Sequence, residues 1–249
     1  MIRDTMLFLG YETKKAFRNP IWPLFGIMQP VLYLLMFAPL QKSLFPGGTT
    51  EEALRSFTPA AMMMIALFGS MFTGFGTIAD LRSGVLERLA VGPVWRPSIV
   101  LGRVLKDVLV LVAQAVAVMV VATLMGLSIG IGALLLMLVL MAATGLFASS
   151  LSQALALSLR DENAISQTIN LFLLPVMLLS GMLIPIAFAP DWMKAIAPVN
   201  PLYHAVEAGR ALFAGDLSNS AIPVAFAVFV VLAVLTVTWS MRSMRKLAG

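Results

Sequence analysis

Few side chains in this sequence are suited to catalysis. The 249 residues contain no cysteine and one histidine, His204, which excludes disulfides, thiolate chemistry and multi-histidine metal sites. The phosphate-binding pattern G-x-x-x-x-G-K-[ST] is absent, as are G-x-S-x-G and H-E-x-x-H. We therefore expect no catalytic residue, bound cofactor or metal ion on this chain, and interpret His204 as a hydrogen-bonding surface residue.

Charged side chains gather in segment 80–97, around Glu87 and Arg88. Its apolar residues recur at every fourth position: Leu81, Val85 and Leu89. This spacing predicts a helix that Gly92 and Pro93 end, and Ser98 is expected to cap the next helix. A short helix held between two membrane spans could work as a mechanical lever. The alternative is an ordinary solvated loop whose charges anchor it to the membrane surface.

Segment 185–220 is the second unusual stretch, because it is rather apolar for a connection. Residues 190–196 predict a short helix with Trp192 and Ile196 on one face. Asn200 and the following proline are typical of a helix start. Glu207 and Arg210, three residues apart, can pair on the helix surface. We expect a re-entrant or interfacial helical hairpin, which either closes a pathway or shields the ends of the spans.

Composition indicates what must position these segments. Hydrophobic residues make up 60% and charged residues 12%, against about 45–50% and about 25% in soluble domains. Lipid must therefore solvate much of the chain. Six apolar stretches are long enough to cross a bilayer, which takes about 20 residues: Ile21–Leu40, Phe57–Ile78, Val108–Met125, Ile131–Leu151, Ile165–Ile184 and Ala221–Trp239. We predict an all-α, polytopic membrane protein with one domain over residues 1–249.

The basic residues fix the predicted orientation. All but four of the 17 lysines and arginines fall in the termini and the even-numbered connections. The exceptions are Lys42, Arg55, Lys194 and Arg210. Because lysine and arginine favour the cytosolic side, both termini are predicted to be cytosolic. The predicted location of the protein is the plasma membrane. The net charge of +5 then reflects topology, and no nucleic-acid partner is expected.

Residues 2–18 predict an amphipathic helix in the cytosolic interface, in contact with membrane lipid. One face is largely apolar: Ile2, Met6, Leu9, Thr13, Ala16 and Phe17. The other face is basic: Arg3, Lys14, Lys15 and Arg18. The alternative is a disordered basic leader.

Polar residues inside the predicted spans are neutral, and no charged residue lies in the middle of a span. Secondary transporters and ion pores usually need such charges, so their absence argues against both classes. The neutral residues expected to line a substrate pathway are Gln29, Thr73, Thr77, Gln167 and Asn170. Small residues at this spacing also suit helix packing. The 17 methionines fit a greasy substrate and equally fit plain packing against lipid.

Two motifs, in this order, resemble those of ABC-2 type transporter permeases, with the daunorubicin-resistance type closest. The first runs from Arg82 to Val94 and continues through Ile99–Leu105. The second runs from Leu174-Pro175 through Ser180-Gly181, Asn200-Pro201 and Tyr203 to Glu207-Ala-Gly-Arg210. The resemblance covers nearly the whole chain, including the leader helix and six spans.

This resemblance implies the transmembrane subunit of an ATP-driven exporter for a hydrophobic or amphiphilic substrate. Two permease copies, as a homodimer, would pair with two copies of a separate ATPase that binds ATP and Mg. The residues it implies for ATPase coupling are Arg82, Glu87, Arg88, Pro93, Arg96, Lys14 and Arg18. The substrate would pass between the permeases, with an external gate of Trp192, Tyr203, Glu207 and Arg210. The alternatives are a membrane scaffold without transport and, less favoured, a secondary transporter.

Overall fold

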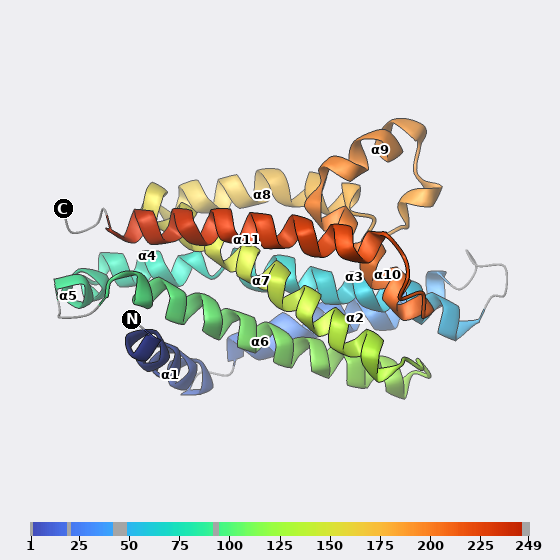
Figure 1. Cartoon of the computed structure of the whole chain (residues 1–249), viewed down its shortest axis with the longest axis horizontal. Helices are drawn as coiled ribbons and strands as arrows, with labels where there is room; N and C mark the ends of the chain where they lie inside the picture. Colours follow the sequence, from blue (N-terminus) through green and yellow to red (C-terminus); the bar gives the residue numbers. More distant parts are fainter. Residues whose placement is uncertain (1, 19–20, 42–48, 92–94, 246–249) are drawn as a thin grey trace.

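The chain folds into a bundle of long helices that run back and forth along one axis (Figure 1). The computed structural model describes residues 2–18, 21–41, 49–91 and 95–245. The long helices are α2 (Ile21–Gln41), α3 (Thr50–Met71), α6 (Pro97–Leu124), α7 (Ile131–Leu159), α8 (Glu162–Leu179) and α11 (Ala221–Arg245). Within the described ranges there is no strand, so the all-α prediction is confirmed.

The shorter elements gather at the two ends of the bundle (Figure 1). One end carries α1 (Ile2–Arg18), α4 (Gly74–Arg82), α5 (Val85–Val91) and the last turns of α11; we call it the basic end. The other carries two short 3₁₀ turns, Ile186–Phe188 and Ala197–Val199, with α9 (Asp191–Ile196) and α10 (Pro201–Ala214). We call this the hairpin end. The helices predicted over residues 2–18 and within 185–220 are thus present.

Five helical segments in the described ranges are long and apolar enough to cross a membrane. They are Thr50–Arg82, Pro97–Leu124, Ile131–Leu159, Glu162–Leu179 and Ala221–Arg245. In α2, the described apolar stretch is the shorter Gly26–Phe37. The third span differs most from its prediction, since its helix begins at Pro97 and not near Val108. The charges of its first turns face other helices, which hydropathy alone does not register.

Helix α3 forms the centre of the bundle. Every residue from Phe57 to Leu67 is buried, and α3 packs against α2, α6, α7 and α10. A helix that is apolar on all sides belongs in the interior, which explains the run Met62–Met64. By contrast, only Ile165 and Ile169 of α8 are buried. One predicted span is therefore a core element, and α8 lies on the periphery.

The second predicted span, Phe57–Ile78, is interrupted between α3 and α4. The Ser152 hydroxyl of α7 donates to the Met71 carbonyl (2.6 Å) and accepts from the Gly74 N–H (2.9 Å). These bonds satisfy backbone groups that the break frees. Gly74 is required here, because a Cβ would lie 2.6 Å from the Ser152 carbonyl oxygen.

Two expectations for segment 80–98 are wrong. The helix does not continue through residues 81–89, because Gly84 has a positive φ of 70° that separates α4 from α5. Ser98 does not cap α6: the cap position is Arg96 with Pro97 in the first turn. The Ser98 hydroxyl donates to the Trp95 carbonyl instead. The predicted break at Gly92–Pro93 lies outside the described residues.

Candidate functional site

A buried arginine, Arg103, organises the basic end. It lies in the second turn of α6, and its side chain is only 7% exposed. Its Nε donates to Glu12 Oε1 of α1 (2.9 Å), and its Nη1 donates to Thr77 Oγ1 of α4 (3.0 Å). Its Nη2 donates to Asp80 Oδ2, also of α4. One guanidinium therefore binds three side chains on two other helices.

The contacts continue outward from this centre. The Thr77 hydroxyl donates to Gln153 Oε1 of α7, and Lys15 Nζ of α1 lies 3.6 Å from Asp80 Oδ2. Glu12 and Asp80 side chains are 10% and 17% exposed. Hydrogen bonds between charged, water-excluded groups are among the stronger ones in proteins. We call Arg103, Glu12, Thr77, Asp80, Lys15 and Gln153 the arginine cluster; it joins α1, α4, α6 and α7.

A glycine next to Arg103 sets how closely α1 approaches α6. A Cβ at Gly102 would lie 2.6 Å from the Phe8 Cβ and 2.9 Å from the Leu9 backbone N. Any larger residue would push α1 away and stretch the bond between Arg103 and Glu12. The side of α1 that packs inward is thus the one with Thr5, Phe8 and Glu12. The sequence assigned Leu9 and Ala16 to the lipid face, whereas both are half-buried.

A second carboxylate, Asp107, lies one turn farther along α6. It is buried, accepts from the Ser149 hydroxyl of α7 (2.6 Å) and pairs with Lys106. Its charge is therefore balanced locally. On the opposite side of the basic end, Arg82 of α4 pairs with Glu162 of α8 (3.2 Å).

The residues expected to couple to an ATPase are spread over this end. Arg88 is exposed on α5, and Arg96 is half-buried at the start of α6. Lys14 and Arg18 are exposed on α1. Pro93 and the Glu87 side chain lie outside the described part of the structure. Sequence reasoning missed Arg103 and Glu12. The available signal was an arginine flanked by Val100, Val104 and other apolar residues at helical spacing.

The five residues expected to line a pathway do not meet within one chain. Gln29 on α2 is exposed, and its Nε2 donates to the Tyr33 hydroxyl (3.3 Å). Gln167 and Asn170 are exposed on α8, which lies on the other side of the bundle from α2 (Figure 1). Thr73 donates to the carbonyl of Ser70. Thr77 is buried in the arginine cluster, between Arg103 and Gln153.

At the hairpin end, Arg210 of α10 joins three segments. Its Nη1 donates to Glu207 Oε1 (2.7 Å), its Nη2 to the Gly181 carbonyl (2.6 Å) and its Nε to the Ser56 carbonyl (3.3 Å). The predicted pair with Glu207 is confirmed. Burial lowers the pKa of Arg210, and the charge of Glu207 opposes this shift. Gly181 has a positive φ of 74°, a conformation that glycine adopts without strain.

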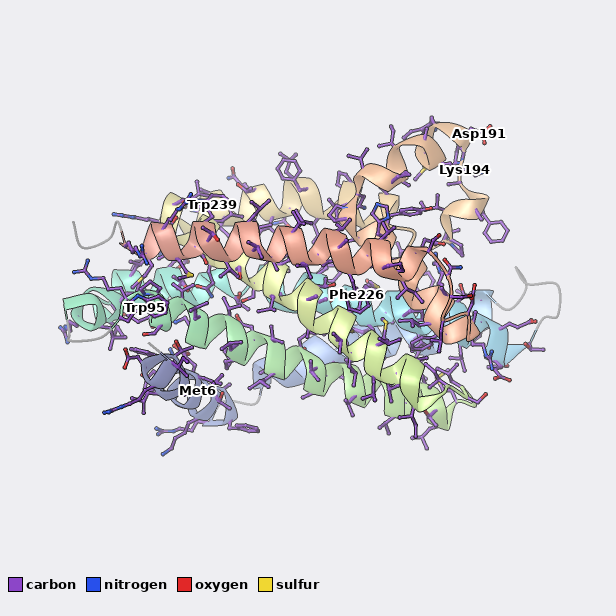
Figure 2. All side chains as sticks on the ribbon, viewed as in Figure 1. Met6, Trp95, Asp191, Lys194, Phe226 and Trp239 are labelled. Atoms are coloured by element: carbon purple, nitrogen blue, oxygen red, sulfur yellow. The ribbon has the colours of Figure 1, made fainter. Side chains whose placement is uncertain are left out.

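The other residues of this end have local partners. Asn200 caps α10 as predicted, since its Oδ1 accepts from the Leu202 N–H (3.0 Å). Its Nδ2 donates to the Val176 carbonyl of α8 (2.6 Å). Burial raises the pKa of Tyr203. His204 forms a hydrogen bond with the Pro198 carbonyl oxygen (2.9 Å), as expected of a surface histidine. Trp192, 62% exposed, lies on α9, which projects from the bundle with Asp191 and Lys194 (Figure 2).

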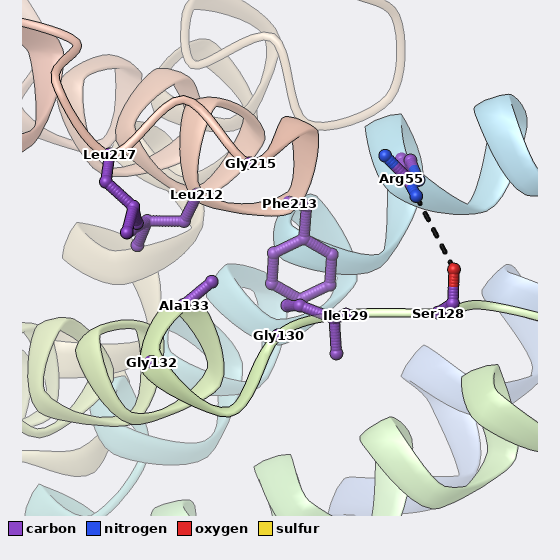
Figure 3. A pocket seen from close by; sticks show the side chains of 10 residues that line it. All are labelled: Arg55, Ser128, Ile129, Gly130, Gly132, Ala133, Leu212, Phe213, Gly215 and Leu217. Atoms are coloured by element: carbon purple, nitrogen blue, oxygen red, sulfur yellow. Dashed lines mark hydrogen bonds between the residues drawn. The ribbon is translucent and has the colours of Figure 1, made fainter.

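A cavity of about 270 Å³ opens at the hairpin end (Figure 3). Arg55 lies at its rim, 3.5 Å from the Ser128 hydroxyl, and pairs with Glu51. The lining is otherwise mostly apolar: Ile129, Gly130, Gly132, Ala133, Leu212, Phe213, Gly215 and Leu217. None of the predicted pathway residues lines it. Among the described residues, no group of three histidine, aspartate or glutamate side chains could hold a metal ion.

Comparison with known proteins gives consistent matches. A family model described as ABC-2 type transporter matches residues 4–214. The daunorubicin resistance ABC transporter permease protein DrrB1 of Streptomyces coeruleorubidus is 27% identical over 208 residues, which cover 82% of this chain and 73% of that protein. The putative transport permease ycf38 of Cyanophora paradoxa is 29% identical over 79% of this chain and 69% of its own. The putative transport permease ycf38 of Pyropia yezoensis is 28% identical over 86% of this chain and 75% of that protein.

Proposed function

The chain belongs to the ABC-2 type transporter family, and we propose that it is the transmembrane subunit of an exporter driven by a separate ATPase. The sequence has no phosphate-binding loop, so ATP and Mg would bind the partner subunit. In the proposed complex, two permease copies form a homodimer and two ATPase copies bind at the basic end.

The proposed topology has six spans, with α2 as the first and α3–α4 as the second. The basic end faces the cytosol in this proposal, because it carries α1, α5 and the Arg242 and Arg245 side chains at the end of α11. The plasma membrane is the proposed location. The hairpin end then faces outward, with its helices α9 and α10 in or near the outer interface.

The observation that carries the proposal is the arginine cluster. It binds α1 and α4 to α6 through a single buried guanidinium. We propose that the ATPase docks on α5 and its flanks, through Arg82, Glu87, Arg88, Pro93 and Arg96. A displacement of α4–α5 would then reach α1 and α6 together, because Asp80 and Glu12 share one partner. This arrangement favours a lever over an ordinary solvated loop.

The exposed amide side chains of α8 support the proposal that a second permease copy lies against this helix. Gln167 and Asn170 are exposed, and in an 18-residue helix Asn170 lies near the middle of the bilayer. The Asn170 Nδ2 donates to the Ser166 hydroxyl within α8 (3.3 Å). Lipid tails cannot supply the further hydrogen bonds that these amides can form, and each unsatisfied polar group costs several kcal/mol. A partner chain or a polar part of the substrate would satisfy these groups. We propose that α8 faces the second copy across the substrate pathway, to which Gln29 and Thr73 contribute less directly.

The Arg210 contacts support an external gate. Arg210 holds the Gly181 turn after α8 against α3 and α10, so movement of α8 must strain or break them. Glu207 positions the guanidinium, Tyr203 lies nearby on α10, and Trp192 is the exposed aromatic residue of α9. The substrate is proposed to be hydrophobic or amphiphilic, because the pathway side chains are neutral and one relative is named for daunorubicin resistance.

Uncoupling tests the proposed function. Glu87→Gln and Arg88→Gln are each expected to leave membrane insertion intact and to abolish export of a fluorescent amphiphile. ATP hydrolysis by the reconstituted complex should persist without substrate stimulation. Arg242→Gln, which makes the same charge change as Arg88→Gln but at the end of α11, should behave as the native chain does. Normal export by both α5 variants would refute the lever, and a native chain that stimulates no ATPase would favour a scaffold.

A further inference from the structure

Both acidic residues of α1 accept hydrogen bonds from α6 or from the residues just before it. Glu12 accepts from Arg103 (2.9 Å), and Asp4 Oδ2 accepts from the Trp95 N–H (3.4 Å). Lys15 also turns inward, toward Asp80. The acidic side of α1 therefore faces the rest of the chain and contacts it.

The remaining basic residues of α1 face away from the bundle. Arg3, Lys14 and Arg18 are exposed, and within the described part of the chain they form no ion pair. At about 100° per residue they fall opposite the inward side of Glu12. No acidic residue of α1 shares this outward side, so it carries three uncompensated positive charges.

An apolar stripe borders these charges on the exposed surface. Ile2 is 79%, Met6 56% and Phe17 80% exposed, and α1 lies outside the bundle of long helices (Figure 2). A stripe of large apolar residues next to a basic stripe is the pattern of a helix at a membrane surface. At about 100° per residue, the apolar stripe falls between the inward side of α1 and its basic side.

The position of α1 along α6 sets its depth. The 28 residues of α6 span about 42 Å, which exceeds the roughly 30 Å hydrocarbon layer by about 12 Å. If Leu124 marks one boundary, the other falls about 20 residues earlier, near Leu105. Gly102, where α6 touches α1, then lies about 5 Å into the headgroup layer. Trp239, toward the same end (Figure 2), suits an interfacial aromatic belt.

We propose that Arg3, Lys14 and Arg18 bind the headgroups of anionic phospholipids in the leaflet at the basic end, while Ile2, Met6 and Phe17 enter the acyl boundary. The arginine cluster fixes α1 in this orientation. The basic side of α1 points along the membrane plane, so Lys14 and Arg18 contact lipid and not the ATPase that the resemblance implied. The inference stands independently of the transport function.

The test uses a single cysteine, because the chain has none of its own. Gly10 lies on the exposed side, and a Cβ there would meet no atom within 4 Å. A fluorophore on the G10C variant would report quenching by spin-labelled phosphatidylglycerol and, separately, by spin-labelled phosphatidylcholine at equal mole fraction. We expect stronger quenching by phosphatidylglycerol, with each basic side chain contributing about fivefold to the preference at low salt.

Two matched variants in the G10C background complete the experiment. K14Q/R18Q should remove most of the preference, whereas R242Q/R245Q, which removes the same charge from α11, should keep it. Adding 1 M salt should reduce the preference of the parent chain, because it shortens the screening length to about 3 Å. Equal quenching by both lipids, or an unchanged preference in K14Q/R18Q, would overturn the proposal. Loss of ATPase binding in K14Q/R18Q with unchanged quenching would assign these residues to the protein partner instead.

Discussion

Replacing Arg103 with methionine should destabilise the basic end more than any other single charge removal there. The variant keeps the apolar stem and removes the guanidinium that Glu12 and Asp80 share. Two carboxylates then remain at 10% and 17% side-chain exposure. The Glu12 and Asp80 carboxylates must then bind a proton, become hydrated or move apart.

The magnitude follows from burial. Breaking a buried ion pair by removing one partner costs about 3–5 kcal/mol, because the other charge stays desolvated. Lys15 lies 3.6 Å from Asp80, but it is 55% exposed, so it recovers only about 0.5 kcal/mol. The net expectation is a loss of about 3 kcal/mol in the free energy of unfolding of the basic end.

Reversible unfolding in mixed micelles, followed by tryptophan fluorescence, measures this loss. Arg103→Lys should be intermediate, since an ammonium keeps the charge but not the planar fork of donors. The triple variant E12Q/D80N/R103M should recover most of the loss, because no unpaired charge remains. Arg242→Met, an exposed arginine of α11, is the control and should change little.

Two results would refute this reasoning. If Arg103→Met unfolds with the native free energy, the guanidinium is not the organising charge of the cluster. If the triple variant is as unstable as Arg103→Met alone, the loss comes from packing of the stem and not from unpaired carboxylates.

Three further predictions concern other contacts. Gly102→Leu should detach α1 from α6 and expose its peptide bonds to protease, whereas Gly10→Leu should leave the cleavage pattern unchanged. Arg210→Gln should loosen the hairpin end, seen as faster amide hydrogen exchange in the turn after α8, without change at the basic end. Hydrogen bonds from the Ala164 N–H and its neighbour hold the pKa of Asp161 below the usual 3.8; this stabilising cap is present above that pH and is lost as the pH falls below it. Exchange in the first turn of α8 should therefore rise in acid, and Asp161→Asn should remove this pH dependence.

The contacts that the sequence predicted correctly are local. Glu207 and Arg210 are three residues apart on one helix, and Asn200 caps the helix that starts at the next residue. Both follow from helix geometry alone. Apolar length likewise predicted six spans, because crossing a bilayer requires it, and five of them are long and apolar enough among the described residues.

The contacts that the sequence did not predict are between distant segments. Arg103 and Glu12 are far apart along the chain, and only the close approach at Gly102 brings them together. Counting charges placed Arg103 in a loop, because hydropathy ends a span at the first cluster of polar residues. A charge whose partner sits on a neighbouring helix can continue an apolar helix. The amphipathic pattern of α1 was likewise correct, but which residues face protein and which face lipid depends on α6.

The break between α3 and α4 gives the second span a joint. Before the break in the sequence, α3 is enclosed by four helices, α2, α6, α7 and α10. After the break, α4 carries Thr77 and Asp80 of the arginine cluster. A single side chain, Ser152, bonds the backbone on both sides of the break, so α3 and α4 are two separate helices that meet at one contact with α7. A displacement of α4 therefore has no continuous helix through which to reach the buried, methionine-rich core around α3.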